Sequence, residues 1–379
     1  MLSYWERSSF LHYDYIVIGA GIVGLSTALS LRERLPKASI LVLERGILPT
    51  GASTKNAGFA CIGSLTEILE DLKTMPVEKV IELVSLRKKG LQKLRNRVGN
   101  DKIDYTENGS YELLMATEIE VLDSMNRVNE LLRPILGCDA YHRADNKLSE
   151  FGFNQSIVKY LIENTCEGQL NSGKMMRTLL DLCMTNQIEV KTGAEVLSIK
   201  PDGNMASVIV RHTPLGTDIS FICQKVAVCT NAFTRKLISD IDIKPGRGQV
   251  LITEPIPNLK FKGVFHFDRG YYYFREVDGR VLFGGGRNME MQMEATDEFA
   301  YNEKILTDLR LKLATILLPF TPHKIDYSWT GIMAFGKDKF PIIRRHSEHT
   351  YIAARMGGMG LAIGSEAGDL LAKLILEEG

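Results

Sequence analysis

The clearest pattern of apolar positions lies near the N-terminus. Residues 15–18 form an apolar run rich in β-branched side chains, which predicts a buried strand. The run breaks at Gly19, and apolar residues then recur over residues 22–32 with the period of a helix. A second apolar run at 40–43 ends in Glu44. This order of strand, turn, helix and strand predicts the first unit of a doubly wound parallel sheet.

Farther along, the pattern alternates between helical stripes and short strands. Residues 76–98 and about 117–133 have the spacing of amphipathic helices, and the second helix is expected to stop at Pro134. From residue 173 a helix, a strand and a β-meander lead to the buried run 225–229. That run predicts that the chain re-enters the parallel sheet, with its carboxyl end at the edge where ligands bind.

After residue 243 the chain changes to strands joined by turns. Residues 271–275 and 280–285 are expected to pair as a hairpin through Asp278 and Gly279. A strand at 351–354 is followed by a glycine cluster and by a helix from 361 to about 376. The patterns therefore predict an α/β protein with a parallel sheet and a second, antiparallel sheet.

Composition limits the classes of protein that need considering. A chain of 379 residues exceeds what one core comfortably fills, so two domains are expected. The formal charge of +0 gives no sign of a nucleic-acid or membrane surface, and no apolar run is long enough to span a bilayer. Residues 1–7 lack an apolar signal core and no Cys-x-x-Cys pair occurs, which favours a cytoplasmic setting. The seven histidines lack ligand spacing, so no metal site is expected.

The first strand–helix junction carries the glycines of a dinucleotide fingerprint. Gly19 permits a tight turn, Gly21 lets the backbone approach a pyrophosphate, and Gly24 lets the helix pack closely on the strand. Glu44 stands twenty residues beyond Gly24, where a carboxylate can accept hydrogen bonds from ribose hydroxyls. An ordinary strand–helix–strand unit with a solvated glutamate is the alternative. The spacing favours binding of an ADP-containing dinucleotide.

A similar junction recurs near the C-terminus. The strand at 351–354 is followed by a cluster that holds Gly357, Gly358 and Gly360 ahead of the last helix. Hydride addition to a flavin leaves negative charge on the N1–C2 carbonyl edge, and a helix N-terminus supplies N–H groups and partial positive charge for it. A simple packing unit is the alternative, but it would not need three glycines so close together.

The first strand of the predicted hairpin is rich in aromatic residues. With a period of two, Tyr271, Tyr273 and Arg275 share one face of this strand. The strand could pack on a core and expose its arginine, or it could form one wall of a substrate pocket.

Taken in order, these segments are similar to the glycine oxidase/D-amino-acid oxidase superfamily of FAD-dependent oxidoreductases, which includes sarcosine oxidase and γ-glutamylputrescine oxidase. The resemblance runs from about residue 13 to residue 376. It is carried by the first glycine fingerprint with Glu44, Gly51-Ala-Ser-x-x-Asn-Ala-Gly58, Val226-Ala-Val-Cys-Thr-Asn-Ala232, Gly246-Arg-Gly-Gln249, Tyr271-x-x-x-Arg275 with Phe283-Gly-Gly285, Asp338-x-x-Pro341 and Ala354-Arg-Met-Gly-Gly-Met-Gly360.

The resemblance implies a Rossmann-like FAD-binding domain, with a parallel sheet and a β-meander, and an α+β substrate domain with an antiparallel sheet. The FAD-binding domain would comprise residues 1–85, 150–244 and 326–379, and the substrate domain residues 86–149 and 245–325. FAD would lie extended from the first junction to a ring site between residues 56–58 and 357–361. The FAD contacts implied are Gly19, Gly21, Ile22, Val23, Gly24, Glu44, Arg45, Ser53, Thr54, Lys55, Asn56, Ala57, Gly58, Val196, Thr230, Asn231, Gly357, Gly358, Met359, Gly360 and Leu361.

Two departures from the family pattern bear on the substrate and the cofactor. Members that act on simple α-amino acids usually carry a Gly-x-Arg-Pro segment whose arginine binds the substrate carboxylate, whereas residues 331–334 here read Gly-Ile-Met-Ala. The same stretch offers no cysteine for covalent attachment, so FAD is expected to be non-covalent. Tyr271 and Arg355 are the first candidates to orient the substrate, and Tyr273, Arg275 and Arg287 are the next.

The expected reaction is oxidation of the C–N bond of an amine or amino acid by hydride transfer to flavin N5, after which the imine hydrolyses. O2 or a quinone-type carrier would accept the electrons. The alternatives are a 2-hydroxy-acid dehydrogenase on the same fold, a catalytically silent flavin-bearing assembly protein, and an NAD-linked enzyme, which the second glycine junction disfavours. The sequence leaves the substrate, the acceptor and the oligomeric state open.

Overall fold

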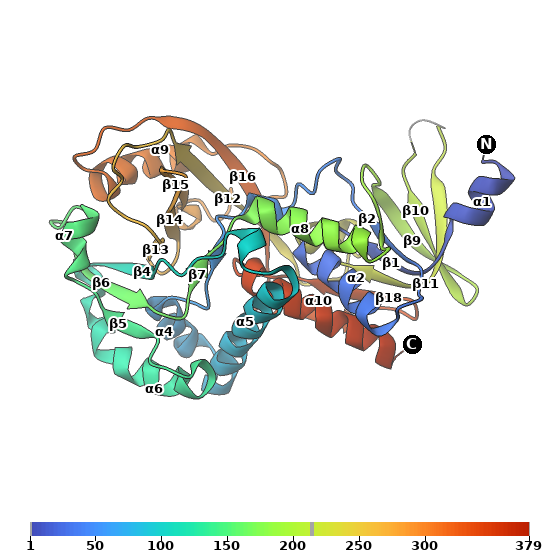
Figure 1. The fold of residues 1–379 in the computed structure, drawn as a ribbon, viewed down its shortest axis with the longest axis horizontal. Helices are drawn as coiled ribbons and strands as arrows, with labels where there is room; N and C mark the ends of the chain where they lie inside the picture. The colour runs from blue at the N-terminus through green and yellow to red at the C-terminus, as the bar shows by residue number, and fades with distance from the viewer. Residues whose placement is uncertain (1, 213–215, 379) are drawn as a thin grey trace.

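The computed structural model describes residues 2–212 and 216–378 and contains two large sheets toward opposite ends of its long axis (Figure 1). Helices α5 (Val77–Val98), α8 (Ser172–Thr185) and α10 (Gly360–Glu377) run between the two sheets. Among the helices of the described residues, none is long and apolar enough to cross a membrane.

The first sheet is built around β1 (His12–Ile18), whose central residues Ile16 and Val17 are fully buried. Strand β1 pairs in parallel with β2 (Ile40–Leu43) on one side and with β11 (Ile219–Val228) on the other. Strand β2 is apolar throughout, as expected of a parallel strand that is buried on both faces, and β1 and β11 are apolar and buried toward their carboxyl ends, at residues 16–18 and 226–228. The sheet is completed by β8 (Glu189–Lys191), β9 (Val196–Asp202), β10 (Met205–Val210), β17 (Ile342–Arg345) and β18 (Thr350–Ala354).

Helix α10 packs against both α2 (Ile22–Arg34) and α5, and so joins the first and last segments of the chain. The approach of α10 to α5 is close, because a Cβ at Gly90 would lie 2.0 Å from the carbonyl oxygen of Ala362. Asp369 on α10 anchors the same region through ion pairs with Arg34, at 2.7 Å, and with Lys93 and Lys373. A Cβ at Gly364 would lie 2.6 Å from the Ile22 side chain, so the first turns of α10 and α2 also lie side by side.

The second sheet has the order β16-β12-β15-β14-β13-β4-β6-β5, and it is antiparallel apart from the pair β4 and β13. One face carries an aromatic core, in which Phe265 and Phe274 stack with their ring centroids 4.7 Å apart. Its strands are β4 (Ser110–Met115), β5 (Tyr141–Arg143), β6 (Val158–Asn164), β12 (Lys244–Thr253), β13 (Val264–Phe267), β14 (Tyr272–Val277), β15 (Arg280–Gly285) and β16 (Ile325–Phe335).

Short elements connect the two sheets. Strand β3 (Phe59–Ala60) pairs antiparallel with β7 (Gly168–Gln169) between them. The predicted hairpin between β14 and β15 is present, and Asp278 and Gly279 both have positive φ, as a two-residue turn of this kind requires. The remaining helices are α1 (Tyr4–Phe10), α3 (Ala52–Lys55), α4 (Leu65–Thr74), α6 (Met125–Leu136), α7 (Lys147–Phe151) and α9 (Glu303–Lys312).

Sheet membership differs from the expected domain boundaries at three places. Strands β6 and β16 belong to the second sheet, although residues 150–244 and 326–379 were assigned to the FAD-binding domain. Helix α5 runs unbroken across the boundary at residues 85 and 86. The reason is long-range pairing: β6 pairs with β4, and β16 pairs with β12 along nearly its whole length. A hydrophobic pattern does not reveal which strand is the partner.

The helix expected at about 117–133 also differs from the prediction. Residues 116–124 form 3-10 turns, and α6 continues through Pro134 to Leu136. Proline removes only one backbone donor, and the buried side chains of Leu132 and Leu136 keep the last turn packed. The helix ends at Gly137, whose N–H donates to the carbonyl of Arg133 at 2.8 Å.

Candidate active site

The first glycine junction has the geometry that its spacing predicts. A Cβ at Gly24 would lie 1.9 Å from the carbonyl oxygen of Gly19, so only glycine lets α2 approach β1 this closely. Helix α2 starts after Gly21 without a side-chain cap, and the N–H of Ile22 donates to the Ser53 hydroxyl at 3.0 Å. The first turn of α2, which includes the amides of Val23 and Gly24, thus begins beside the segment that contains Ser53, and the N-terminus of a helix is suited to binding an anion.

Glu44 lies at the carboxyl end of β2, next to this junction. Its carboxylate accepts hydrogen bonds from the N–H groups of Ala20 and Gly46, both at 3.0 Å. An ionised carboxylate has about four acceptor positions, so some remain for ribose hydroxyls. The carbonyl of Glu44 accepts from Ala194 at 2.8 Å, which brings the start of β9, with Val196, close to the same edge. The Arg45 guanidinium instead lies 3.8 Å above the ring of Phe233.

The segment 51–58 is held in shape by its own polar groups. The Asn56 Oδ1 accepts from the Gly58 N–H at 2.8 Å and from the Ser172 hydroxyl at 2.7 Å. The Thr54 hydroxyl donates to the Pro49 carbonyl at 2.7 Å, and the Lys55 carbonyl accepts from the Trp329 indole N–H at 3.0 Å. These contacts fix Ala57 and Gly58 at the side of β16 and leave a hollow of about 320 Å³ beside Lys55 and Trp329.

The second glycine junction faces the same region from the other side. Helix α10 begins at Gly360 after Met359 without a side-chain cap, and Leu361 is buried in its first turn. The Gly357 N–H donates to the Ala334 carbonyl of β16 at 2.9 Å. Farther back on β16, a Cβ at Gly331 would lie 3.3 Å from the Lys55 side chain. Strand β16 therefore extends from the segment 51–58 to the second junction.

The end of β11 positions this second junction. Asn231, which follows Thr230, has a positive φ of 47°. Its Oδ1 accepts from the N–H groups of Arg355 at 3.0 Å and Met356 at 3.3 Å. The Thr230 hydroxyl pairs instead with that of Thr234 at 3.1 Å. Asn231 thus supports the glycine cluster through its side chain.

Glycines that face open space indicate room for a large bound group between the two junctions. A Cβ at Gly51, Gly357 or Gly358 would meet no atom within 4 Å. Packing within the protein therefore does not explain glycine at these positions, and for Gly51 and Gly358 the backbone φ does not require it either. A flat ring and a diphosphate lying against the backbone explain it. The residues present thus fit an extended dinucleotide.

On the second sheet, Tyr273 and Arg275 both contact the segment 57–59, and the alternation had predicted that these two residues share one strand face. The rings of Phe59 and Tyr273 lie edge to face at 5.7 Å, and burial raises the pKa of Tyr273 to about 12. Arg275 donates through Nη1 to the carbonyls of Ala57, Gly58 and Leu170, the last at 2.8 Å. Burial lowers the pKa of Arg275 to about 10. Arg275 thus clamps the backbone of the cofactor segment.

Arg355 is occupied by protein partners, which departs from the expectation that it offers a cation to the substrate. Its guanidinium donates to Asp242 at 2.5 Å and to Asp338 at 2.6 Å, while Nε donates to the Phe340 carbonyl at 3.0 Å. Asp242 lies 113 residues before Arg355 and Asp338 lies 17 residues before it, so no local spacing pairs either aspartate with Arg355. The arrangement ties β18 to the segment before β17.

Arg287 differs from Arg355 in that its guanidinium is not bound to acidic side chains of the described residues. It is half-buried at the end of β15 and lies 4.0 Å above the ring of Phe335, next to Ala334. In the described part of the chain it makes neither an ion pair nor a hydrogen bond through its guanidinium. Burial lowers the pKa of Arg287. The Tyr271 carbonyl accepts a hydrogen bond from the N–H of Gly286 at 3.0 Å, which places Tyr271 beside Arg287. Of the three candidate arginines, Arg287 is the one whose guanidinium makes no hydrogen bond with the described residues, whereas Arg275 and Arg355 each make several.

Tyr271 is presented by a constrained turn. Asp268, Arg269 and Gly270 all have positive φ, between 50° and 77°, and the Asn288 amide donates to Asp268 at 3.0 Å. Such a run in a left-handed conformation is costly for non-glycine residues and is found mainly where a site demands it. Tyr271 precedes β14 and packs partly against the aromatic core, so it does not continue the strand face of Tyr273.

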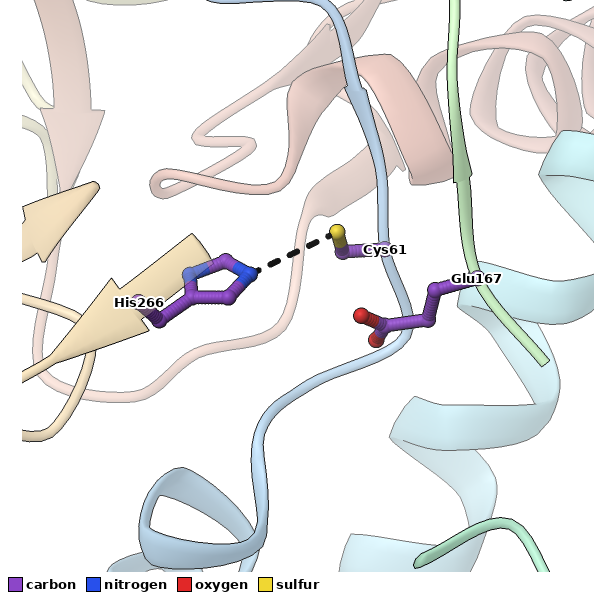
Figure 2. Close-up of side chains that lie close together, drawn as sticks. All are labelled: Cys61, Glu167 and His266. Carbon is purple, nitrogen blue, oxygen red and sulfur yellow. Dashed lines mark hydrogen bonds between the residues drawn. The ribbon is translucent and has the colours of Figure 1, made fainter. Parts of the chain in front are cut away.

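The structure also brings together three buried residues that the sequence did not single out. Cys61, Glu167 and His266 converge beside the pocket strands, as Figure 2 shows. They are separated by about a hundred residues each, so no spacing rule could have found them. Burial raises the pKa of the Cys61 thiol well above its ordinary value, and the Glu167 charge raises it further.

The structure thus combines a sheet that has two glycine-rich strand–helix junctions with a second, largely antiparallel sheet. The chain belongs to the DAO family of FAD-dependent oxidoreductases, whose model matches residues 14–374. Its cofactor is accordingly FAD.

Two curated relatives and one solved structure illustrate the family relationship. The chain is 24% identical to "Probable oxidoreductase OrdL" of Haemophilus influenzae, over 96% of this chain and 83% of that protein. It is 25% identical to the gamma-glutamylputrescine oxidoreductase of Escherichia coli, again over 96% and 83%. The crystal structure of glycine oxidase from Geobacillus kaustophilus superposes with a TM-score of 0.77 at 19% identity, and covers 97% of this chain and 95% of that one. At that identity the superposition establishes the fold.

Proposed function

We propose that this enzyme oxidises the C–N bond of an amine or amino acid that carries a carboxylate, and that Arg287 and Tyr271 bind that carboxylate. One observation supports the proposal above all. Arg287 is a half-buried arginine without a protein partner for its donors in the described residues, and it lies beside the strand that links the two FAD junctions. A guanidinium in such a place is suited to bidentate recognition of a carboxylate.

The missing family arginine is consistent with this assignment. Residues 331–334 lie between Lys55 and Gly357, at the expected ring site, and Met333 occupies the third position of that segment. A Cβ at Gly248 on β12 would lie 3.1 Å from the Met333 methyl. An apolar side chain therefore replaces the cation there. Arg287 approaches Gly246 on the same strand, where a Cβ would lie 3.3 Å from its Nη1, so the cation would reach the pocket from β15.

The proposed mechanism needs few acid–base groups from the protein. Bound FAD supplies the two-electron acceptor for a hydride at its N5 position. Arg287 would hold the carboxylate and Tyr271 would donate a hydrogen bond, so that the α-carbon hydrogen points at the ring. Phe59, Tyr273 and Met333 would form an apolar wall that excludes water. The amine would react in its neutral form, and the resulting imine would hydrolyse after release.

FAD would be bound without a covalent link, as the absence of a thiol in residues 331–334 suggests. Acid precipitation of the purified yellow protein should leave the flavin in the supernatant. Flavin that stays with the pellet would contradict this part of the proposal.

The reaction class is tested by anaerobic titration of the bound flavin, followed by its loss of visible absorbance. We expect bleaching by members of a panel of amino acids and amines, and none by the matching 2-hydroxy acids. Bleaching by hydroxy acids alone would replace the proposal with a 2-hydroxy-acid dehydrogenase. A flavin that no donor reduces, in protein with full FAD content, would favour a catalytically silent role.

A further inference from the structure

The cluster of Cys61, Glu167 and His266 lies where three distant segments meet (Figure 2). Strand β3 pairs with β7 through Ala60 and Gly168, so Cys61 and Glu167, the residues next to that pair, are brought to the same place. His266 reaches them from β13 of the second sheet. One ligand atom from each side chain lies within 4.8 Å of the other two, and all three residues are buried.

We propose that Cys61, Glu167 and His266 form a binding site for a divalent transition metal of the zinc class. The Cys61 Sγ and His266 Nε2 lie 3.6 Å apart. Tetrahedral zinc, with bonds of about 2.3 Å to sulfur and about 2.0 Å to nitrogen, holds two such atoms about 3.5 Å apart. A thiolate and an imidazole are ligands that favour zinc and its neighbours over calcium or magnesium. Three protein ligands leave a fourth position for water.

The surroundings of Glu167 orient its carboxylate for this role. It accepts hydrogen bonds from the N–H groups of Ile62 at 2.6 Å and Gly63 at 2.9 Å, and from the Ser110 hydroxyl at 2.5 Å. Three bonds leave one of its roughly four acceptor positions for a metal. Supporting hydrogen bonds of this kind fix the direction of ligating carboxylates in metal sites.

The charged groups around the cluster determine whether it suits a cation. Glu112 and Glu167 are 4% and 2% exposed, and the partners of Glu167 in the described residues are uncharged. Two buried arginines lie near the cluster: Arg87 donates its Nη1 to the Ile62 carbonyl at 2.7 Å, and Arg275 donates its Nη1 to the carbonyls of Gly58 and Leu170, so neither pairs with a carboxylate in the described residues. A divalent metal bound to one thiolate and one carboxylate would make the cluster neutral, which suits a buried site.

Such a metal would couple the cofactor segment to the pocket wall. Cys61 follows the segment 51–58, and the Phe59 ring lies edge-on to His266 at 5.1 Å and to Tyr273 at 5.7 Å. The site would therefore hold the second sheet against the FAD-binding half. Metal binding is expected to raise the melting temperature of the FAD-bound enzyme and to leave its FAD content unchanged.

The test uses FAD-bound enzyme that has been treated with a chelator, desalted and titrated with Co²⁺ or Zn²⁺. We expect about one Co²⁺ per chain, with the thiolate-to-cobalt absorption band that tetrahedral sites show, and displacement of that band by Zn²⁺. The variants Cys61→Ser and His266→Gln should lose the band and the metal-dependent rise in melting temperature. Cys183→Ser removes another buried thiol, in α8, and should behave as the parent.

The parent protein alone can overturn the proposal. If it binds no Co²⁺ after desalting, or binds it without a thiolate band, the cluster is a packed thiol–imidazole contact and not a metal site. Binding by Cys61→Ser as tight as by the parent would also exclude it. Should that variant fail to fold, the Co²⁺ spectrum of the parent decides the question.

Discussion

The cofactor edge of the first sheet and the pocket side of the second sheet use their residues in different ways. At the cofactor edge, the proposed contacts come from the backbone. Gly24 lets α2 pack closely on β1, and the uncapped starts of α2 and α10 offer N–H groups. On the pocket side, the proposed contacts come from side chains, and a side chain is available only if its hydrogen-bond donors are not already bound to other groups of the protein. Arg275 is bound to carbonyls and Arg355 to two aspartates, whereas Arg287 has neither.

This difference shows which kinds of functional site can be predicted from the spacing of residues in the sequence. A backbone site is fixed by local sequence, because a strand, a turn and a helix follow one another within about ten residues. The role of an arginine is fixed by partners such as Asp242 or Leu170, which lie about a hundred residues away from the arginine that they bind. Chemically equivalent arginines therefore have different uses here.

The largest effect should come from the backbone side. Gly21→Val places a branched side chain at the start of α2, where the diphosphate would approach. Even a Cβ alone at this position would lie 3.0 Å from the Ser53 hydroxyl oxygen. We expect purified protein that lacks FAD, measured as the ratio of flavin to protein absorbance. Gly173→Val, in the first turn of α8, is the matched control and should keep its flavin. Stoichiometric FAD in Gly21→Val would show that this junction is only a packing turn.

The next effect tests the pocket side. Arg287→Met should slow reduction of bound flavin by a working donor roughly 30–1,000-fold at sub-saturating concentration, the loss of about 2–4 kcal/mol expected for a charge-assisted contact in a desolvated site. FAD content should stay normal. Arg280→Met, at the other end of β15, is the control, because Arg280 pairs with the surface residue Asp326. Equal rates for both variants would remove Arg287 from the site.

Arg355 should behave as a structural residue. Replacing it with methionine leaves Asp242 and Asp338 without their partner, and should lower the free energy of unfolding by about 1–3 kcal/mol, less than for a fully buried pair because both aspartates are partly exposed. Denaturant unfolding measures this. The rate of flavin reduction per bound FAD should change little. A large loss of rate without a loss of stability would restore Arg355 as the substrate cation.

A smaller effect concerns the helix that carries the second junction. Burial alone would raise the pKa of Asp369, but hydrogen bonds from Lys93, Arg34 and Lys373 outweigh it and lower that pKa. A lowered pKa in the folded state gives stability that is present above the ordinary carboxyl range and is lost as the pH falls below it.

Asp369→Asn should therefore cost about 1–3 kcal/mol of unfolding free energy at pH 7, and the gap to the parent should shrink steadily below about pH 4. Urea unfolding at several pH values measures the gap. Glu377→Gln, an exposed change on the same helix, should alter stability by less than about 0.5 kcal/mol throughout. A gap for Asp369→Asn that does not change with pH would contradict the ion-pair explanation.

Much of the fold could be predicted from the sequence, because periodicity reports on local structure. Residues 15–18, 40–43 and 351–354 are strands, α5 and α10 lie within a residue or so of their expected bounds, and the hairpin turn is at Asp278 and Gly279. The pairing of β6 and β16 with the second sheet could not be predicted, since strand pairing is a long-range property. The two glycine junctions were visible because each is a local pattern of strand, turn and helix.

The pocket was harder to predict from the periodicity of the sequence. The alternation placed Tyr273 and Arg275 on one face of their strand, but it could not show that this face meets the segment 57–59 or that the carbonyls of Ala57, Gly58 and Leu170 already bind Arg275. The cluster of Cys61, Glu167 and His266 carries no local signal at all. Its members meet only because β3 pairs with β7 and the second sheet packs beside them.

The central claim is that Arg287 recognises a substrate carboxylate beside FAD that is held mainly by backbone. It is tested most directly with a pair of donors, an α-amino acid that reduces the flavin and the amine that lacks its carboxylate. Stopped-flow reduction would compare the two donors in the parent and in Arg287→Met. We predict that the parent prefers the acid by roughly 30–1,000-fold and that the variant reduces this preference to near unity. A preference that is the same in both proteins would contradict the claim.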